Sequence, residues 1–359
     1  MKKLPAYQMI YQDLEKKIRN GFWKDGQQLP TEFELSEQYQ VSRITVRHAL
    51  QLLVEKGSII RLQGKGSIVT KKVKSSGVIA VAINDFGPFF GEEFIKSVIL
   101  HAEKEGYSVI LQTCYYSPQQ ENSVLLRLLD SNIAGLIFVP LYGSKNVSPE
   151  LKKVADRLPL VFADRKIDGL DAPLVCTDNI SATEELCRRL IHIGHRRIGF
   201  ISSNTDSTVV RDRLKGYVNA LTTSGINIDE SLKLTTLRSV LPGMSTSAAQ
   251  EEDIAAIQQY FQQNPDIHAV VAHTYRAAEL VYLAAQRAKL RIPQDCAIVC
   301  FDAMHDVIPS PGFFAHMKQN EYEMGEEAVK ALLSLIRHKP VRKLNFVNAI
   351  FQDGKSYVY

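Results

Sequence analysis

The chain has 359 residues, of which 45% are hydrophobic, and this is enough for two or three compact domains with buried cores. This composition excludes a disordered chain. No apolar run is long enough to cross a membrane, and the N-terminus lacks a secretory signal, so we expect a cytoplasmic protein without a membrane partner. Residues 1–74 carry 14 Lys+Arg and 7 Asp+Glu, whereas residues 75–359 carry 29 and 32. This asymmetry favours a polyanion as the partner of the N-terminal segment, although a solvated basic face would have the same composition.

Three short helices are predicted at the start of the chain. The first carries apolar residues at helical spacing and ends near Gly21. Thr31 stands three residues before Glu34 in a capping-box pattern, which predicts a second helix that continues to about Tyr39. After a tight turn, Ser42 can cap a third helix. The apolar positions of the third helix are Val46, Ala49, Leu50 and Leu53. Two helices joined so closely predict a helix-turn-helix.

A β-hairpin is predicted next, in SIIRLQGKGSIVTKK. Its two apolar runs flank Gln63, Gly64, Lys65 and Gly66, so that a lysine lies at the tip. A helix-turn-helix followed by such a hairpin predicts a winged helix, which we assign to residues 1–70. KKVKSSG, residues 71–77, is then a short linker.

From Val78 the pattern changes to apolar strands that alternate with longer helices. This alternation predicts an α/β domain with parallel, doubly wound sheets over residues 78–359. The series restarts at PLVCTDN, residues 173–179, which divides the domain into two lobes. Ligands of such sheets bind at the carboxyl ends of the strands, so we expect a site in the cleft between the lobes.

Residues 5–70 resemble the GntR-type winged-helix regulators. The resemblance rests on the start at Pro5–Tyr7, on LPTEFELSEQYQVSRITVRHAL and on the wing GKGSIV. It implies that the third helix contacts phosphates and bases of double-stranded DNA and that the wing enters the minor groove. Arginine can bond guanine bidentately, and an isoleucine can touch a thymine methyl group. The predicted DNA-binding residues are Ser42, Arg43, Ile44, Thr45, Arg47, Gln63, Gly64 and Lys65.

Two observations compete with this interpretation of the third helix. Arg43 and Arg47 could instead only solvate the helix and pair with nearby glutamates. Phe33 departs from the family pattern, because many relatives carry a basic residue at this position, and one DNA contact is therefore in question.

Residues 77–359 resemble the effector-binding domain of the LacI/GalR repressors, which has the periplasmic sugar-binding fold. The motifs are PLVFADR, VCTDN, LIHIGHRRIGFIS, RDRLKGY, CAIVCFD and HMKQN, in this order. The fold implies three crossovers, with a first lobe at about 78–164 and 320–338 and a second at about 165–319 and 339–359. With the N-terminal domain, the architecture is similar to arabinose repressors of the AraR kind. The hinge helix of LacI proteins has no counterpart in KKVKSSG.

The effector site is carried over from this resemblance by motif. An arginine fork and a carboxylate can each bind neighbouring hydroxyls of a sugar, and an aromatic face can pack on its ring. The predicted effector-binding residues are Asn84, Asp85, Phe86, Tyr142, Arg213, His273, Asp302 and Gln319. His273-Thr274 stands where the family commonly has Asn-Asp. The competing interpretation makes Arg213 and Asp302 a structural salt bridge, and Phe86 and Tyr142 rim residues.

Enzyme motifs are absent from the sequence: it has no G-x-S-x-G, P-loop, H-E-x-x-H or dinucleotide-binding pattern. The five cysteines lack metal or redox spacing, so we expect reduced packing residues, no metal site and no cofactor. We expect a homodimeric, sugar-responsive repressor that a small carbohydrate releases from its operator. A sugar phosphate or other metabolite as effector, or activation in place of repression, stays open. A sugar-binding protein or a glycosidase-like enzyme is the remote alternative.

Overall fold

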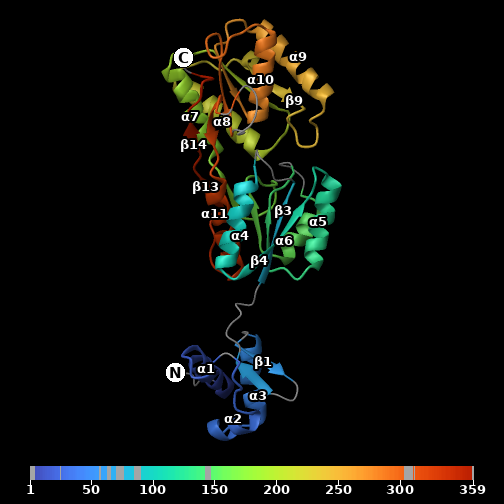
Figure 1. Ribbon diagram of the computed structural model, residues 1–359, viewed down its shortest axis with the longest axis vertical. Coiled ribbons are helices and arrows are strands. Elements are labelled where there is room, and N and C mark those ends of the chain that lie inside the picture. Colours follow the sequence, from blue (N-terminus) through green and yellow to red (C-terminus); the bar gives the residue numbers. More distant parts are fainter. Residues whose placement is uncertain are drawn as a thin grey trace. The chain divides into compact units, whose positions relative to one another are not determined.

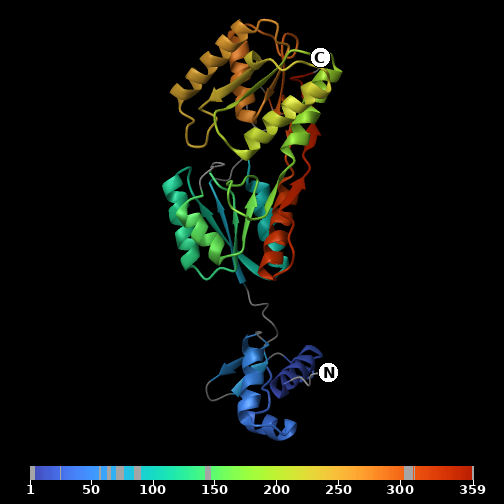
Figure 2. The ribbon, with the colours of Figure 1, turned by 180° about the vertical axis from the view of Figure 1, so that it is seen from behind.

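The structure is a computed structural model that describes residues 5–24, 26–55, 58–62, 66–69, 77–84, 90–141, 147–302, 310 and 312–357 (Figures 1 and 2). It divides into two compact units. The first ends at Gly77 and also includes Glu105–Ser108, and the second contains the remainder from Val78 onward. Among the described helices, none is both long and apolar enough to span a membrane.

The N-terminal unit is a winged helix-turn-helix. Its elements are α1 (Ala6–Arg19), α2 (Glu32–Tyr39), α3 (Arg43–Glu55), β1 (Ile59–Leu62) and β2 (Gly66–Val69). The two strands pair antiparallel, from Ile59 opposite Val69 to Leu62 opposite Gly66. The core contains the four apolar positions predicted on the third helix, so the helical spacing is confirmed. Its buried residues are Ile10, Leu14, Leu29, Leu35, Val46, Ala49, Leu50, Leu53, Ile59 and Val69.

A capping box fixes the start of α2, as the sequence predicts. The Thr31 side chain accepts a hydrogen bond from the Glu34 backbone N–H at 3.2 Å, and the Glu34 carboxylate accepts one from the Thr31 N–H at 2.7 Å. The helix ends at Gln40, whose φ of 52° is left-handed. Ser42 Oγ then accepts the Thr45 N–H at 3.3 Å at the start of α3. Local bonds thus set the turn that orients α3.

We expect Thr31→Ala to lower the stability of the winged helix by about 0.5–2 kcal/mol, because it removes the side-chain acceptor of the capping box. Trp23 is the only tryptophan of the chain and packs against the N-terminal core. Its fluorescence during urea unfolding of the full-length protein therefore reports on this unit. Thr31→Ser keeps the hydroxyl and should unfold like the wild type. A midpoint that Thr31→Ala leaves unchanged would show that the box contributes nothing.

The first lobe of the second unit is built on a six-stranded sheet with the order β13-β7-β6-β5-β3-β4. Helices α4 and α11 pack against each other, and α5 packs against α6 (Figure 1). The strands are β3 (Gly77–Ile83), β4 (Tyr107–Thr113), β5 (Gly135–Phe138), β6 (Leu160–Ala163), β7 (Leu174–Thr177) and β13 (Leu344–Val347). The helices are α4 (Glu92–Lys104), α5 (Pro118–Asp130), α6 (Pro149–Arg157) and α11 (Glu321–Ile336).

The second lobe is built on a sheet with the order β14-β12-β11-β10-β8-β9, in which the edge strand β14 is antiparallel. Helices α7 and α8 pack together, as do α9 and α10. The strands are β8 (Ile198–Ser203), β9 (Lys233–Leu237), β10 (Ala269–Ala272), β11 (Ala297–Phe301), β12 (Ala315–Lys318) and β14 (Ile350–Gln352). The helices are α7 (Asn179–His192), α8 (Thr208–Thr223), η1 (Glu230–Leu232), α9 (Ser247–Gln263) and α10 (Tyr275–Arg287). The two largely parallel sheets confirm the predicted α/β class.

The predicted boundary between the lobes is wrong at one strand pair. PLVCTDN was expected to open the second lobe, but its strand β7 pairs with β6 and β13 in the first sheet. The first lobe therefore runs through Thr177, and it also holds β13, which the prediction gave to the second lobe. The reason is the connection from β6 to β7, residues 164–173, which contains no helix. A missing helix interrupts the alternation and resembles a new start.

Candidate nucleic-acid interface and effector site

The N-terminal turns of α3 present the predicted DNA-binding residues on one exposed side. Arg43, Ile44 and Arg47 are exposed, and Ser42 Oγ lies 2.8 Å from Thr45 Oγ1. Ile44 is 78% exposed, although the opposite side of the same helix is buried. An exposed isoleucine between two arginines contributes nothing to the core. It has the chemistry to contact a thymine methyl group beside arginine contacts to guanine.

Glu32 pairs with two arginines of the winged helix. Arg47 Nε and Nη2 donate to Glu32 Oε2 at 3.2 and 3.0 Å, and Arg61 Nη2 lies 3.2 Å from Oε1. The hydrogen bond from Arg47 is the main reason why the pKa of Glu32 is lowered. Such exposed pairs stabilise a fold little, and the pairing of Arg47 with a glutamate was the competing interpretation. Here the pair with Glu32 also fixes the orientation of the Arg47 guanidinium on the exposed side of α3.

Phe33, the residue that departs from the family pattern, contacts Arg43. The Arg43 guanidinium carbon lies 4.8 Å from the centre of the Phe33 ring, in cation–π geometry. Phe33 thus packs against a neighbouring arginine of α3 at the position where the family pattern has a basic residue. Gln63, Gly64 and Lys65, the predicted wing tip, lie outside the described residues. Their DNA contacts stay a prediction.

The carboxyl ends of the strands place several predicted effector residues where the two lobes are joined. Asn84 follows β3 in the first lobe, and His273 and Asp302 follow β10 and β11 in the second. Thr177, at the end of β7, donates from Oγ1 to Gln319 Oε1 across the lobes at 2.8 Å. Asp85, Phe86 and Tyr142 lie outside the described residues.

Arg213 is the central cation of this site, and only 2% of its surface is exposed. Its Nε donates to Asn179 Oδ1 at 2.7 Å, its Nη1 donates to the His273 carbonyl, and its guanidinium carbon lies 3.6 Å from the centre of the Phe301 ring. Burial lowers the pKa of Arg213 to about 10. Within the described part of the chain, no carboxylate lies within ion-pair distance of Arg213. The structure therefore does not contain the alternative Arg213–Asp302 salt bridge.

Asp302 is held in place by Gln319. Gln319 Nε2 donates to Asp302 Oδ2 at 2.9 Å, and its backbone N–H donates to Oδ1 at 3.4 Å. Asp302 has a φ of 62°, a left-handed conformation that is uncommon outside glycine and typical of constrained sites. Burial raises the pKa of Asp302 to about 6. Near neutral pH, this carboxylate can accept hydrogen bonds from a ligand.

Three buried polar atoms around the strand ends have no hydrogen-bond partner among the described residues: Asn84 Oδ1, Thr208 Oγ1 and His273 Nδ1. His273 Nε2 lies 3.4 Å from Ser203 Oγ, and burial lowers the pKa of His273 to about 3, so its imidazole is neutral. Buried polar atoms are rarely unsatisfied in folded proteins. These three can therefore donate to or accept from a hydroxylated ligand.

Several residues of this region were missed by sequence reasoning. Thr208 begins α8, and its hydroxyl is one of the unpaired atoms. Asn179 accepts a hydrogen bond from Arg213 and so orients its guanidinium. It was not predicted as a site residue, although it is the last residue of the motif VCTDN and could have been found there. Arg211 Nη2 lies 2.6 Å from Asp168 Oδ2 and connects α8 to the loop of residues 164–173 in the first lobe. Only the fold brings α8 beside the start of α7 and the loop of residues 164–173, because no local pattern links these three segments.

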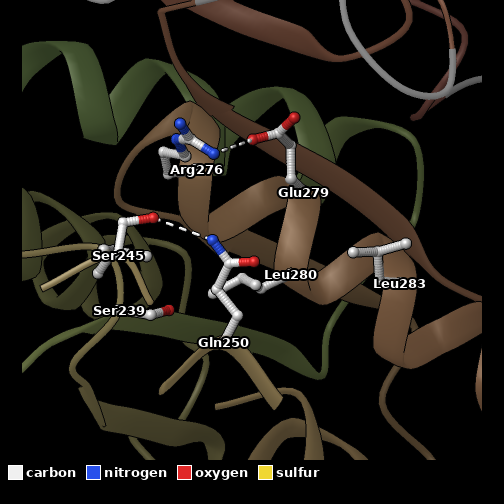
Figure 3. A pocket seen from close by; sticks show the side chains of 8 residues that line it. Ser239, Ser245, Gln250, Arg276, Glu279, Leu280 and Leu283 are labelled. Atoms are coloured by element: carbon white, nitrogen blue, oxygen red, sulfur yellow. Dashed lines mark hydrogen bonds and ion pairs between the residues drawn. The ribbon is translucent and has the colours of Figure 1, made fainter. Parts of the chain in front are cut away.

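A separate small cavity of about 100 Å³ lies in the second lobe, between α9, α10 and the segment after β9 (Figure 3). Its polar residues pair with one another: Gln250 Nε2 donates to Ser245 Oγ at 2.9 Å, and Arg276 lies 3.8 Å from Glu279. None of the predicted effector residues lines it. The lining residues are Ser239, Val240, Ser245, Gln250, Arg276, Glu279, Leu280 and Leu283.

Comparison with protein families matches both units. Residues 76–343 match the periplasmic binding proteins and sugar binding domain of the LacI family, and residues 6–69 match the bacterial regulatory proteins of the gntR family. The arabinose metabolism transcriptional repressor of Geobacillus stearothermophilus is 25% identical over 96% of this chain and 94% of its own. The repressor CytR of Escherichia coli K12 is 26% identical over 84% of each chain.

Solved structures of transcription regulators share the fold. The regulator CcpA of Lactococcus lactis is 18% identical, with a TM-score of 0.67 over 79% of this chain and all of its own. A complex of the regulator CelR with cellobiose is 21% identical, with a TM-score of 0.65 over 88% of this chain and 92% of its own.

Proposed function

Because the chain belongs to the LacI-type family of periplasmic binding proteins and sugar-binding domains, and carries a gntR-type N-terminal domain, we propose that it is a cytoplasmic transcription regulator whose binding to operator DNA is controlled by a small carbohydrate. The observation that carries the proposal is the buried Arg213, which Asn179, the His273 carbonyl and the Phe301 ring hold at the lobe junction. The exposed side of α3 in the same chain carries the residues proposed to contact DNA. One chain thus combines a domain that senses the sugar with a domain that reads DNA.

The proposed mechanism is a population shift. A ligand that contacts both lobes favours the arrangement in which these contacts form, and this changes the affinity of the protein for its operator. The ion pair between Arg211 and Asp168 joins α8 to the first lobe and belongs to such an arrangement. Relatives named as repressors support release by the sugar over activation.

A homodimer on a pseudo-palindromic operator is part of the proposal. Winged-helix and helix-turn-helix regulators commonly read two half-sites whose symmetry mirrors that of the protein. One short helix such as α3 reads only a few base pairs, so a second copy supplies the remaining specificity.

A sugar phosphate is the second candidate effector, and one observation favours it. Arg213 has no close carboxylate in the described structure, so that part of its charge is available to an anionic group. Against this, Asp302 and Asp164 lie near enough to raise the pKa of Arg213 in opposition to burial. Their charge would repel a phosphate, and a neutral sugar is therefore our first choice.

A thermal-shift panel of pentoses, hexoses, sugar acids and sugar phosphates on the full-length protein tests the proposal. A true effector at a hundred times its dissociation constant should stabilise its domain by about 2.7 kcal/mol. Neutral sugars and sugar phosphates in one panel separate the two candidates, and turnover of the bound sugar would favour a glycosidase.

Coupling is tested with an operator selected from random duplexes. We expect the sugar to change operator affinity and the operator to change sugar affinity by the same factor, since coupling free energy is reciprocal. Both dissociation constants can be measured by fluorescence anisotropy and calorimetry. Binding of the two ligands without mutual effect would contradict the regulatory mechanism.

A further inference from the structure

A strongly basic loop connects α11 to β13 in the first lobe. Residues 337–343, RHKPVRK, contain four Lys+Arg and one histidine, without any acidic residue. The chain after residue 74 is otherwise slightly acidic, so this loop is an exception within its unit. All five basic side chains of the basic loop, residues 337–343, are exposed: Arg337, His338, Lys339, Arg342 and Lys343.

The backbone of the basic loop is fixed by hydrogen bonds. His338 has a left-handed φ of 52°, and its N–H donates to the Leu335 carbonyl at 2.9 Å. The Lys339 N–H donates to the Ser334 carbonyl at 2.8 Å, and Asn345 Nδ2 donates to the Arg342 carbonyl at 3.3 Å. The cations therefore stand on an ordered turn, which lowers the entropy cost of binding a ligand.

Helix stabilisation explains only part of this charge. Cations near the C-terminus of α11 interact favourably with the helix dipole, and Arg337 and His338 lie there. Arg342 and Lys343 lie beyond the last turn of α11, immediately before β13. Lys343 pairs with Asp171 at 2.8 Å, but each side chain of this pair is 79% exposed, so the pair is weak and readily exchanged. Lys339 and Arg342 form no ion pair within the described residues.

The position of the basic loop separates it from the effector site. β13 is parallel to β7, and β7, β6, β5 and β3 are parallel in turn, so β13 and β3 begin at the same end of the sheet, where the amino ends of these strands lie. The effector residues lie at the carboxyl ends of the strands, at the opposite end. Four strand spacings of about 4.8 Å put the starts of β13 and β3 about 19 Å apart. The chain enters this domain from the winged helix at β3, and Figure 2 shows the lower end of red α11 at that end of the lobe.

We propose that the basic loop binds the phosphodiester backbone of DNA beside the segment that the winged helix reads. This inference rests on the proposed function, since it needs the chain to bind DNA. Phosphate contacts by lysine and arginine position a protein on the duplex and carry no sequence information. The loop therefore adds affinity, not base preference.

The experiment compares the wild-type chain with the triple variant Lys339→Gln, Arg342→Gln, Lys343→Gln. Both bind a fluorescent random-sequence duplex of about 40 base pairs, because backbone binding does not depend on sequence. The control triple variant loses the same charge in the second lobe, at three exposed lysines that form no ion pair in the described structure: Lys215, Lys289 and Lys355. Anisotropy is measured over a salt titration.

We expect the loop variant to reduce the slope of log K against log salt by about 2–3, since each lost phosphate contact removes about 0.9. Its affinity at low salt should fall at least tenfold, which is our estimate for three such contacts. The control should keep the wild-type slope, and Arg342→Lys, which keeps the charge, should keep it too.

Three results would overturn the inference. A loop variant with the wild-type slope would refute the contact while leaving the proposed function intact. An equal change in the control would assign the effect to overall charge. A wild-type chain that binds neither this duplex nor a selected operator would refute the proposed function as well, so the two failures are distinguishable.

Discussion

Arg47→Ala is expected to weaken operator binding by about 1–3 kcal/mol, or roughly 5- to 150-fold, and to relax base preference at one position of each half-site. The guanidinium lies exposed at the second turn of α3, and Glu32 holds it there through Nε and Nη2. A fixed planar fork can bond guanine bidentately, which alanine cannot do. The measurement is anisotropy against the selected operator and against each single-base change in it.

Arg61→Ala is the matched control, because Arg61 pairs with the same Glu32 but lies on β1. It should weaken binding to all sequences alike and keep the base preference. If Arg47→Ala keeps the wild-type preference at every position, Arg47 only pairs with Glu32 and another residue reads the bases.

The winged helix was predictable from sequence because its signals are local. The capping box of Thr31 and Glu34 spans three residues, and the buried stripe of α3 follows one helical period. The pairing of Arg47 with Glu32 was not specified by the sequence, since the two residues are fifteen positions apart on different helices. Which of the several glutamates would face Arg47 depends on the angle between α2 and α3.

The order of strands was less predictable than their positions. β7 is an apolar run like the other buried strands, and nothing in its composition says which sheet it joins. Its connection to β6 lacks a helix, so alternation misplaced the lobe boundary. Hydrogen bonding to β13, more than 150 residues later in the chain, gives β7 its second neighbour.

The candidate effector site was also only partly predictable from the sequence. Motifs placed Arg213, Asp302 and Gln319 at the lobe junction, but not the contacts that hold them. Arg213 donates a hydrogen bond to the His273 carbonyl. His273, which departs from the family pattern, therefore contributes its backbone to the site in addition to its side chain. Backbone groups and a hydroxyl such as that of Thr208 have no sequence signature of their own.

Arg213→Met is expected to abolish the stabilisation by the effector sugar while DNA binding remains. Methionine fills similar space but offers no donor, so a bound sugar would lose its fixed fork, and truncation of a buried hydrogen-bonded charge typically costs about 2–5 kcal/mol of affinity. That cost is a loss of roughly 30- to 5,000-fold. It is measured by calorimetry with the sugar that gives the largest shift in the panel.

Folding must be separated from binding in this variant, because Asn179 Oδ1 and the His273 carbonyl lose their donor. Each unpaired buried acceptor costs about 1–3 kcal/mol, so a lower unfolding temperature is expected even without sugar. Arg211→Met, two residues earlier on α8, removes the half-exposed ion pairs with Asp168 and Asp206 and should lose at most about 1 kcal/mol of sugar affinity. A folded Arg213→Met protein that binds the sugar as the wild type does would make Arg213 a structural residue. The ligand would then be held by Asp302 and the unpaired atoms of Asn84, Thr208 and His273.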